Sequence, residues 1–191
     1  MIDPTLRPVF WRNTMVKQLA CAVVMGIACW GMDAKAQSCA ELCELYSSLL
    51  MTPERNLIGS IRRLEMLPKP PPGPRNMRGR WVQREVFLGE ESFDTTFYLR
   101  SGLVQRIELV SNAPDSRCRS RSPWSAAIAA LEAWKGKTTV QGQFEQDNST
   151  QQSVHWAADE IDVSVFQTTT TENCSTKVAF KKRDVKESSQ L

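Results

Sequence analysis

The chain has 191 residues, of which 24 are Lys or Arg and 21 are Asp or Glu, giving a formal net charge of +3 at pH 7. Residues 1–36 hold four of the basic and two of the acidic residues. Residues 37–191 therefore hold 20 basic and 19 acidic residues, with a net charge of +1. Nucleic-acid-binding domains carry a basic excess across the whole domain, so this balance excludes that class. The remaining length of about 155 residues suits one domain with a modest core.

Residues 1–36 are predicted to be an N-terminal extension and a cleaved signal peptide, with the signal core at 15–36. An uncharged apolar run over 19–32 is followed by Ala34-Lys35-Ala36, which matches the small-residue site of a signal peptidase. The run is shorter than the ~20 residues that a transmembrane helix needs. We therefore expect cleavage before Gln37, a periplasmic or secreted protein, and no transmembrane anchor after processing.

Four of the six cysteines remain after this cleavage, and an even number in an exported chain indicates disulfide bonds. The candidates are Cys39, Cys43, Cys118 and Cys174, for which the sequence leaves three connectivities open. We expect at least one long-range bridge, because a bridge that closes a long loop restricts the unfolded chain most. Zinc sites favour shorter Cys spacings, so we expect no metal and no cofactor.

The first predicted elements are two helices. Residues 38–50 have apolar stripes at helical spacing, and a second helix should begin near Pro53 and end before Pro68. The proline-rich segment at 68–75 favours polyproline II and predicts a stiff, solvated linker. A three-stranded antiparallel meander is then predicted at 81–88, 93–100 and 103–110.

A polar loop at 111–121 precedes a helix that begins at Ser122 and ends at Gly136. Four more strands are predicted, followed by a flexible C-terminal tail at 184–191; the strands are 138–144, 153–157, 161–170 and 177–182. The predicted fold class is α+β, with N-terminal helices, an antiparallel meander, a central helix and a further antiparallel strand set. These elements should form one compact two-layer domain over residues 37–183.

Catalytic residues are not indicated by the sequence. A hydrolytic triad needs a histidine beside a nucleophile and an acid, and we interpret the single histidine, His155, as a surface or structural residue. The carboxylates at Glu90-Glu91 and at Asp159-Glu160-Asp162 are typical of hairpin turns. We expect a protein that is not an enzyme, with a hydrolase that uses His155 or a carboxylate pair, tested at His155 and Asp159, as the third alternative.

Arginines and one tryptophan gather in two segments and predict a partner-binding face. Arg and Trp are favoured at interface hot spots, and alternating arginines in an extended loop would place their guanidinium groups on one side. The predicted partner-binding residues are Arg75, Arg78, Arg80, Trp81, Arg84, Arg117, Arg119 and Arg121.

The charge distribution along the chain is uneven. Residues 55–121 hold 13 basic and 7 acidic residues, whereas residues 122–176 hold 2 and 7. One face of such a molecule suits an acidic partner.

These features together favour a periplasmic, non-enzymatic binding or inhibitor protein that acts through a protein–protein interface with a protein partner. In size, signal and fold class the chain is similar to small exported binding proteins, including periplasmic immunity proteins that neutralise secreted toxins. No diagnostic residue carries this similarity. The second alternative is an envelope-assembly or small-ligand carrier protein, with a pocket between helix and sheet.

Overall fold

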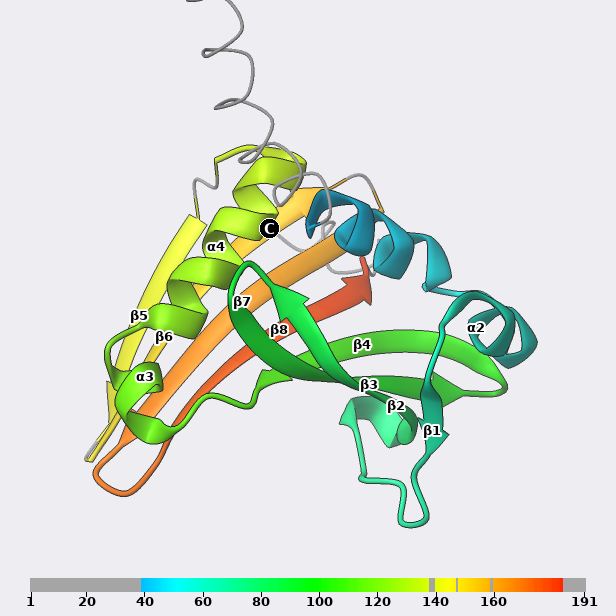
Figure 1. Cartoon of the computed structure of the whole chain (residues 1–191), viewed down its shortest axis with the longest axis horizontal. Coiled ribbons are helices and arrows are strands. Elements are labelled where there is room, and N and C mark those ends of the chain that lie inside the picture. Colours follow the sequence, from blue (N-terminus) through cyan, green and yellow to red (C-terminus); the bar gives the residue numbers. More distant parts are fainter. Residues whose placement is uncertain (1–38, 138–139, 147, 159, 184–191) are drawn as a thin grey trace, which may run out of the picture. The chain divides into compact units, whose positions relative to one another are not determined.

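The computed structural model describes residues 39–137, 140–146, 148–158 and 160–183. The predicted signal peptide with its cleavage site, the tail at 184–191 and Asp159 lie outside the described residues. The described chain forms a single α+β domain, in which helices pack on one face of an eight-stranded antiparallel sheet (Figure 1). The predicted fold class is therefore confirmed.

The element order repeats helices followed by four strands. A helix over residues 39–49 and α2 (Glu54–Ser60) precede β1 (Leu64–Met66), β2 (Arg78–Leu88), β3 (Glu91–Arg100) and β4 (Leu103–Ser111). The second half consists of α3 (Asp115–Arg119), α4 (Ser122–Lys135), β5 (Val140–Gln146), β6 (Ser149–Ala158), β7 (Ile161–Thr170) and β8 (Cys174–Lys182).

The strand order in the sheet is β1-β2-β3-β4-β8-β7-β6-β5, so two four-stranded meanders meet where β4 pairs with β8. At this junction Arg106 lies opposite Lys181 and Val110 lies opposite Lys177. The strands β2, β3 and β4 begin at residues 78, 91 and 103, and β6, β7 and β8 begin at 149, 161 and 174, a nearly constant offset. The second half thus repeats the strand topology of the first.

The second predicted helix is too long at its C-terminal end. It ends at Ser60, and after a turn in which Arg63 has φ of +56°, residues 64–66 form the edge strand β1. Leu64 pairs with Gln83 of β2. Three residues with two apolar positions fit a helix turn as well as a strand, so the periodicity could not distinguish them.

Most residues of the proline-rich segment at 68–75 are exposed, and the segment also folds back onto the sheet. The Gly79 backbone N–H donates a hydrogen bond to the Pro71 carbonyl oxygen at 3.0 Å. A Cβ atom at Gly73 would lie 2.6 Å from Cδ1 of Tyr98, and one at Gly79 would lie 2.9 Å from Cγ of Pro71. The segment approaches the Tyr98 ring this closely because glycine has no side chain.

We expect Gly79→Ala to lower the free energy of unfolding by about 1–3 kcal/mol, because the new methyl group overlaps its neighbours. Thermal or urea unfolding followed by tryptophan fluorescence measures this change. Gly59→Ala is the matched control: a Cβ there has nothing within 4 Å, and alanine favours the helix by up to about 1 kcal/mol. Equal stability of Gly79→Ala and the wild-type protein would show that the segment does not rest on the sheet.

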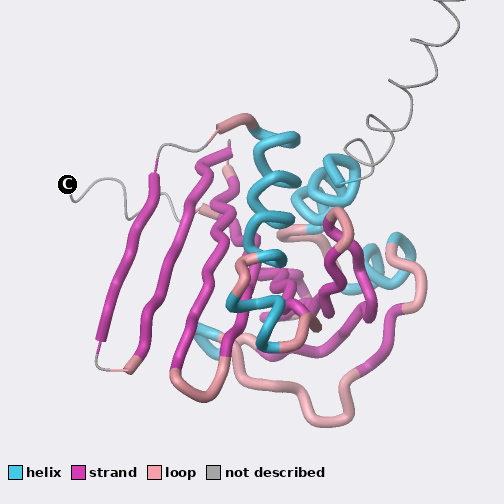
Figure 2. Tube along the Cα trace, turned by 60° about the vertical axis from the view of Figure 1, so that its left-hand side comes forward, coloured by secondary structure: helices cyan, strands magenta, loops and turns pink. Residues whose placement is uncertain are grey.

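The hydrophobic core lies between the sheet and the helices, with α4 and the helix of residues 39–49 on the same side (Figure 2). Tyr46 of the N-terminal helix meets Phe97 of β3 and Phe180 of β8 edge-on, with ring centroids 5.7 and 6.0 Å apart. The Tyr46 hydroxyl lies 3.1 Å from Oγ1 of the buried Thr95. These rings fill the layer between helix and sheet, and edge-to-face pairs of this kind stabilise a core beyond their buried area.

Candidate partner-binding surface

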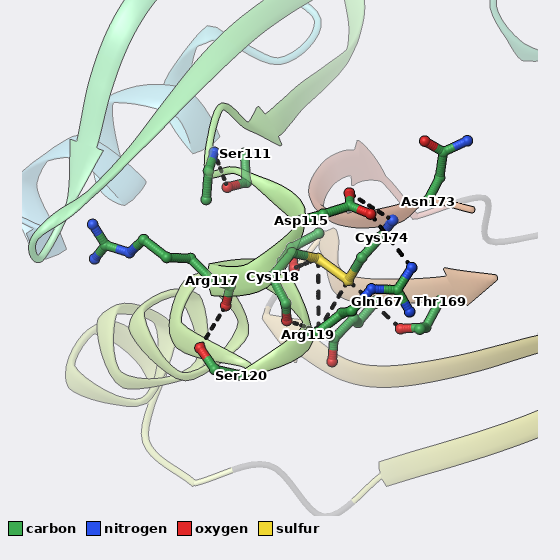
Figure 3. Close-up of a disulfide and its surroundings, with 12 residues drawn as sticks. Ser111, Asp115, Arg117, Cys118, Arg119, Ser120, Gln167, Thr169, Asn173 and Cys174 are labelled. Carbon is green, nitrogen blue, oxygen red and sulfur yellow. Dashed lines mark hydrogen bonds and ion pairs between the residues drawn. A yellow bond between two sulfur atoms is a disulfide. The ribbon is translucent and has the colours of Figure 1, made fainter. Parts of the chain in front are cut away.

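A disulfide joins Cys118 of α3 to Cys174 at the start of β8, with an S–S distance of 2.07 Å and a sequence separation of 56 (Figure 3). The predicted long-range bridge is confirmed, and a bridge of this kind suits an oxidising, extracytoplasmic compartment. Cys39 and Cys43 are buried and unbridged in the described structure. Burial, together with the neighbouring Cys39 and Glu44, raises the pKa of Cys43 to about 12, so this thiol stays protonated and unreactive.

The three arginines around this bridge do not form the predicted extended array. Residues 115–119 are helical, and the guanidinium groups contact groups within the protein. Their partners are Glu91 for Arg117, Asp115 and the Thr170 carbonyl for Arg119, and the Trp124 ring for Arg121. Glu91 is only 4% exposed, so its pair with Arg117 fixes α3 against the sheet.

The other predicted binding residues lie on or before β2. Arg80 pairs with Glu54 of α2 at 3.2 Å, and the indole N–H of Trp81 donates to the same carboxylate at 2.6 Å. Arg84 pairs with Asp94 of β3; Arg78 is exposed. Like the arginines near the bridge, Arg80, Trp81 and Arg84 therefore contact groups within the protein, which in their case are carboxylates.

The sheet face opposite the helices carries a second, different set of side chains. Cross-strand pairing places Val140, His155, Ser164, Ala179 and Glu108 in one row from β5 to β4. The next row consists of Ala157, Asp162, Lys181, Arg106 and Tyr98. Because alternate residues of a strand share a face, this surface is a mixture of charged, aromatic and small side chains.

Three hollows adjoin one another on this face, and we call them together the sheet groove. The first hollow has a volume of about 370 Å³, lies over β5 to β8 and is lined in part by His155 and Phe166. The second has a volume of about 460 Å³ and lies between β4, the end of β8 and the proline-rich turn. The third has a volume of about 320 Å³ and is lined in part by Phe166 and Lys177. Arg106 lines all three, so the hollows form one continuous surface.

Arg106 owes its position to an irregularity in β4. Arg106 pairs with Tyr98 and Val104 pairs with Leu99, which leaves Gln105 as an extra residue between them. An extra residue in one strand bends it and redirects its side chains. Gln105 and Arg106 consequently both line the second hollow, although neighbouring residues of a regular strand face opposite sides.

Two carboxylates on this face are each shared by two cations. Glu108, only 6% exposed, pairs with Arg106 and with Nζ of Lys177 at 3.5 Å. Asp162 pairs with Nε of Arg183 at 2.9 Å and with Nζ of Lys181 at 3.7 Å. Each cluster therefore has one more positive than negative charge, and the two clusters lie side by side through the Arg106–Lys181 pairing.

His155 is held on the groove floor by hydroxyl groups. Its Nδ1 lies 2.8 Å from Oγ of Ser164 and its Nε2 lies 3.2 Å from Oγ of Ser153, while its ring meets Phe166 at 5.7 Å. A serine hydroxyl does not supply the negative charge with which a triad acid stabilises the imidazolium. These contacts fix the ring of His155 beside the first hollow.

The described residues contain no group of three or more His, Cys, Asp or Glu able to hold a metal ion. In the same part of the chain, no helix has both the length and the apolar character required to cross a membrane. No family model, no curated protein and no solved structure matches the chain. The geometry of the groove therefore carries the functional argument.

Both tyrosines of the chain should resist ionisation in the folded protein. Burial, followed by the neighbouring Glu108, raises the pKa of Tyr98 to about 12, and burial raises the pKa of Tyr46 well above its ordinary value. These folded-state pKa values lie above the unfolded value of about 10. The contribution of the protonated tyrosine hydroxyls to the free energy of unfolding is therefore complete below about pH 10 and falls as the pH rises towards 12.

An alkaline titration followed by tyrosinate absorbance tests this expectation, with Tyr98→Phe and Tyr46→Phe assigning each transition. We expect no ionisation near pH 10 while circular dichroism reports native structure. Ionisation of both tyrosines near pH 10 in the folded protein would contradict the burial of these hydroxyls.

Proposed function

We propose that the protein is an exported, non-enzymatic binding or inhibitor protein that binds a protein partner through the sheet groove. The observation that carries this proposal is the continuity of the three hollows across the sheet face opposite the helices. This surface presents a central arginine and aromatic rings, which are residue types enriched at protein–protein interfaces.

The end of the groove at β5 supports a protein partner. Val140 and Phe144 are 56% and 60% exposed, and their pairing with His155 and Gln151 places them on the groove side of the sheet. Exposed apolar patches of this kind commonly mark interaction sites.

The filled space between helices and sheet favours this proposal over the carrier alternative. A carrier of the expected kind would hold its ligand in that layer. Tyr46, Phe97 and Phe180 occupy it and are each at most 1% exposed. We propose the periplasm, or the medium outside the cell, as the site of action, in keeping with the disulfide.

Affinity capture from envelope extract under oxidising conditions tests the function, with the full chain expressed, exported and purified from its host. The groove variant is Val140→Glu with Phe144→Glu, and the control is Ile58→Glu, since Ile58 is 51% exposed on α2. We expect a stoichiometric protein partner that the wild type and the control capture and the groove variant loses.

The identity of the captured protein decides between simple binding and inhibition. If it is a secreted enzyme or toxin, adding the purified protein should suppress its activity, and the groove variant should not. Capture that is equal for all three forms, or no capture by any, would refute binding through this groove.

A further inference from the structure

Most of the residues that line the second hollow of the sheet groove are basic. Its volume is about 460 Å³, and none of the described residues that line it is acidic. The basic side chains around it are Arg75, Arg100, Arg106, Lys181, Lys182 and Arg183. Because the domain as a whole is nearly neutral, this is a local concentration of charge rather than a general property of the surface.

These charges are only partly neutralised within the protein. Arg106 shares Glu108 with Lys177, and Lys181 shares Asp162 with Arg183. The pair between Lys182 and Glu160 involves a carboxylate side chain that is 80% exposed, and exposed pairs are weak. Arg100 makes no ion pair with another residue in the described part of the chain.

One donor at this hollow is unsatisfied. The Nη2 atom of Arg183 is buried and has no hydrogen-bond partner among the described residues, although Nε of the same side chain binds Asp162. A buried donor without an acceptor costs free energy.

The fold holds several of these cations in place before any ligand arrives. The β4 irregularity and the contact with Glu108 fix Arg106. Arg75 lies in a turn where it and Asn76 have φ of +53° and +61°, and this turn rests on the Tyr98 ring. Cations that are already positioned lose less conformational entropy on binding, which favours affinity.

From this geometry we infer that the second hollow of the sheet groove binds the carboxylates of an acidic peptide segment. The inference rests on the proposed function, because that segment belongs to the protein partner. The cations come from the turn, the end of β3, β4 and the end of β8, and are spread around the hollow. Met51, Met77 and Pro74 also line it. A peptide with several carboxylates on aliphatic stems complements both features, whereas one phosphate group would contact few of these cations at once.

The test is fluorescence anisotropy with a labelled peptide of alternating Glu and Ala and with its Gln counterpart. We expect the Glu peptide to bind, the Gln peptide not to bind, and the affinity to fall as salt shortens the screening length. Arg100→Glu with Lys182→Glu should weaken binding by roughly tenfold or more. Arg62→Glu with Lys135→Glu changes the net charge equally away from the groove and should change the affinity by less than about twofold.

Several outcomes would overturn the inference. The first two are equal binding of the Gln and Glu peptides, and an equal loss of affinity in both double variants. The third is complete displacement of the Glu peptide by inorganic phosphate or by vesicles of anionic lipid, at competitor concentrations that leave the Glu peptide unsaturated. Partner capture that needs Val140 and Phe144 but is unaffected by Arg100→Glu with Lys182→Glu would overturn the acidic segment and leave the proposed function standing. Groove-specific binding of the Glu peptide without any captured protein would overturn the proposed function alone.

Discussion

Replacing both bridged cysteines, as Cys118→Ala with Cys174→Ala, should lower the free energy of unfolding by about 4 kcal/mol, as expected for a bridge that closes a loop of this length. The bridge spans a separation of 56 residues and fastens α3 to the beginning of β8. Additional contacts converge there: the Cys174 N–H donates to Asp115 at 3.1 Å, and Gln167 donates to the Cys118 carbonyl at 2.6 Å. Urea unfolding under oxidising conditions measures the loss.

Reductant provides the internal control for the bridge. Dithiothreitol should destabilise the wild-type protein by a similar amount and leave the double alanine variant unchanged, because Cys39 and Cys43 are unbridged in the described structure. A loss below about 1 kcal/mol would contradict the structural role of the bridge, since native disulfides in small exported domains commonly contribute more.

Phe180→Ala should be comparably destabilising, with a loss of about 3–5 kcal/mol, as is usual for removal of a fully buried aromatic ring. Phe180 lies on β8, 1% exposed, and its ring contacts Tyr46 of the N-terminal helix and Trp134 of α4 at centroid distances of 6.0 and 6.1 Å. Its loss would open a cavity where both helices meet the sheet.

Phe166→Ala is the matched control for Phe180→Ala. Phe166 is the same residue type on the adjacent strand β7, but it lies on the groove face and is half-buried. We expect it to cost about 1–2 kcal/mol, because a partly exposed ring loses less burial and leaves no enclosed cavity. Equal losses for the two variants, measured by urea unfolding, would contradict the assignment of the core to the helix side.

The sequence was sufficient to predict the fold class and most element positions. The period-two alternation in 93–100 and the Ser101-Gly102 turn predicted β3 and β4 within one or two residues of their ends. Gly136, which has φ of +79°, ends α4 as predicted. The strand β1 was missed because Leu64, Glu65 and Met66 are stabilised by pairing with β2, and such long-range pairing leaves no local signal in a three-residue segment.

The sheet groove could not be predicted in the same way. Arginines that are close in sequence, such as Arg117 and Arg119, were predicted to bind a partner because they lie near each other in the chain. Each of them has an ion-pair partner within the protein. Arg106 and Lys181 are distant in sequence and become neighbours only through the pairing of β4 with β8. No pattern in either segment reveals that pairing, since it depends on the order of strands in the sheet.

The placement of β8 has a consequence for how the domain acquires its structure. The last strand in the chain lies in the centre of the sheet, between β4 and β7. The two meanders therefore remain separate until residues 174–182 have been synthesised and inserted, and closing contacts over such long sequence separations is slow. A chain shortened before β8 would expose the hydrogen-bonding edges of both β4 and β7, which are sites for aggregation.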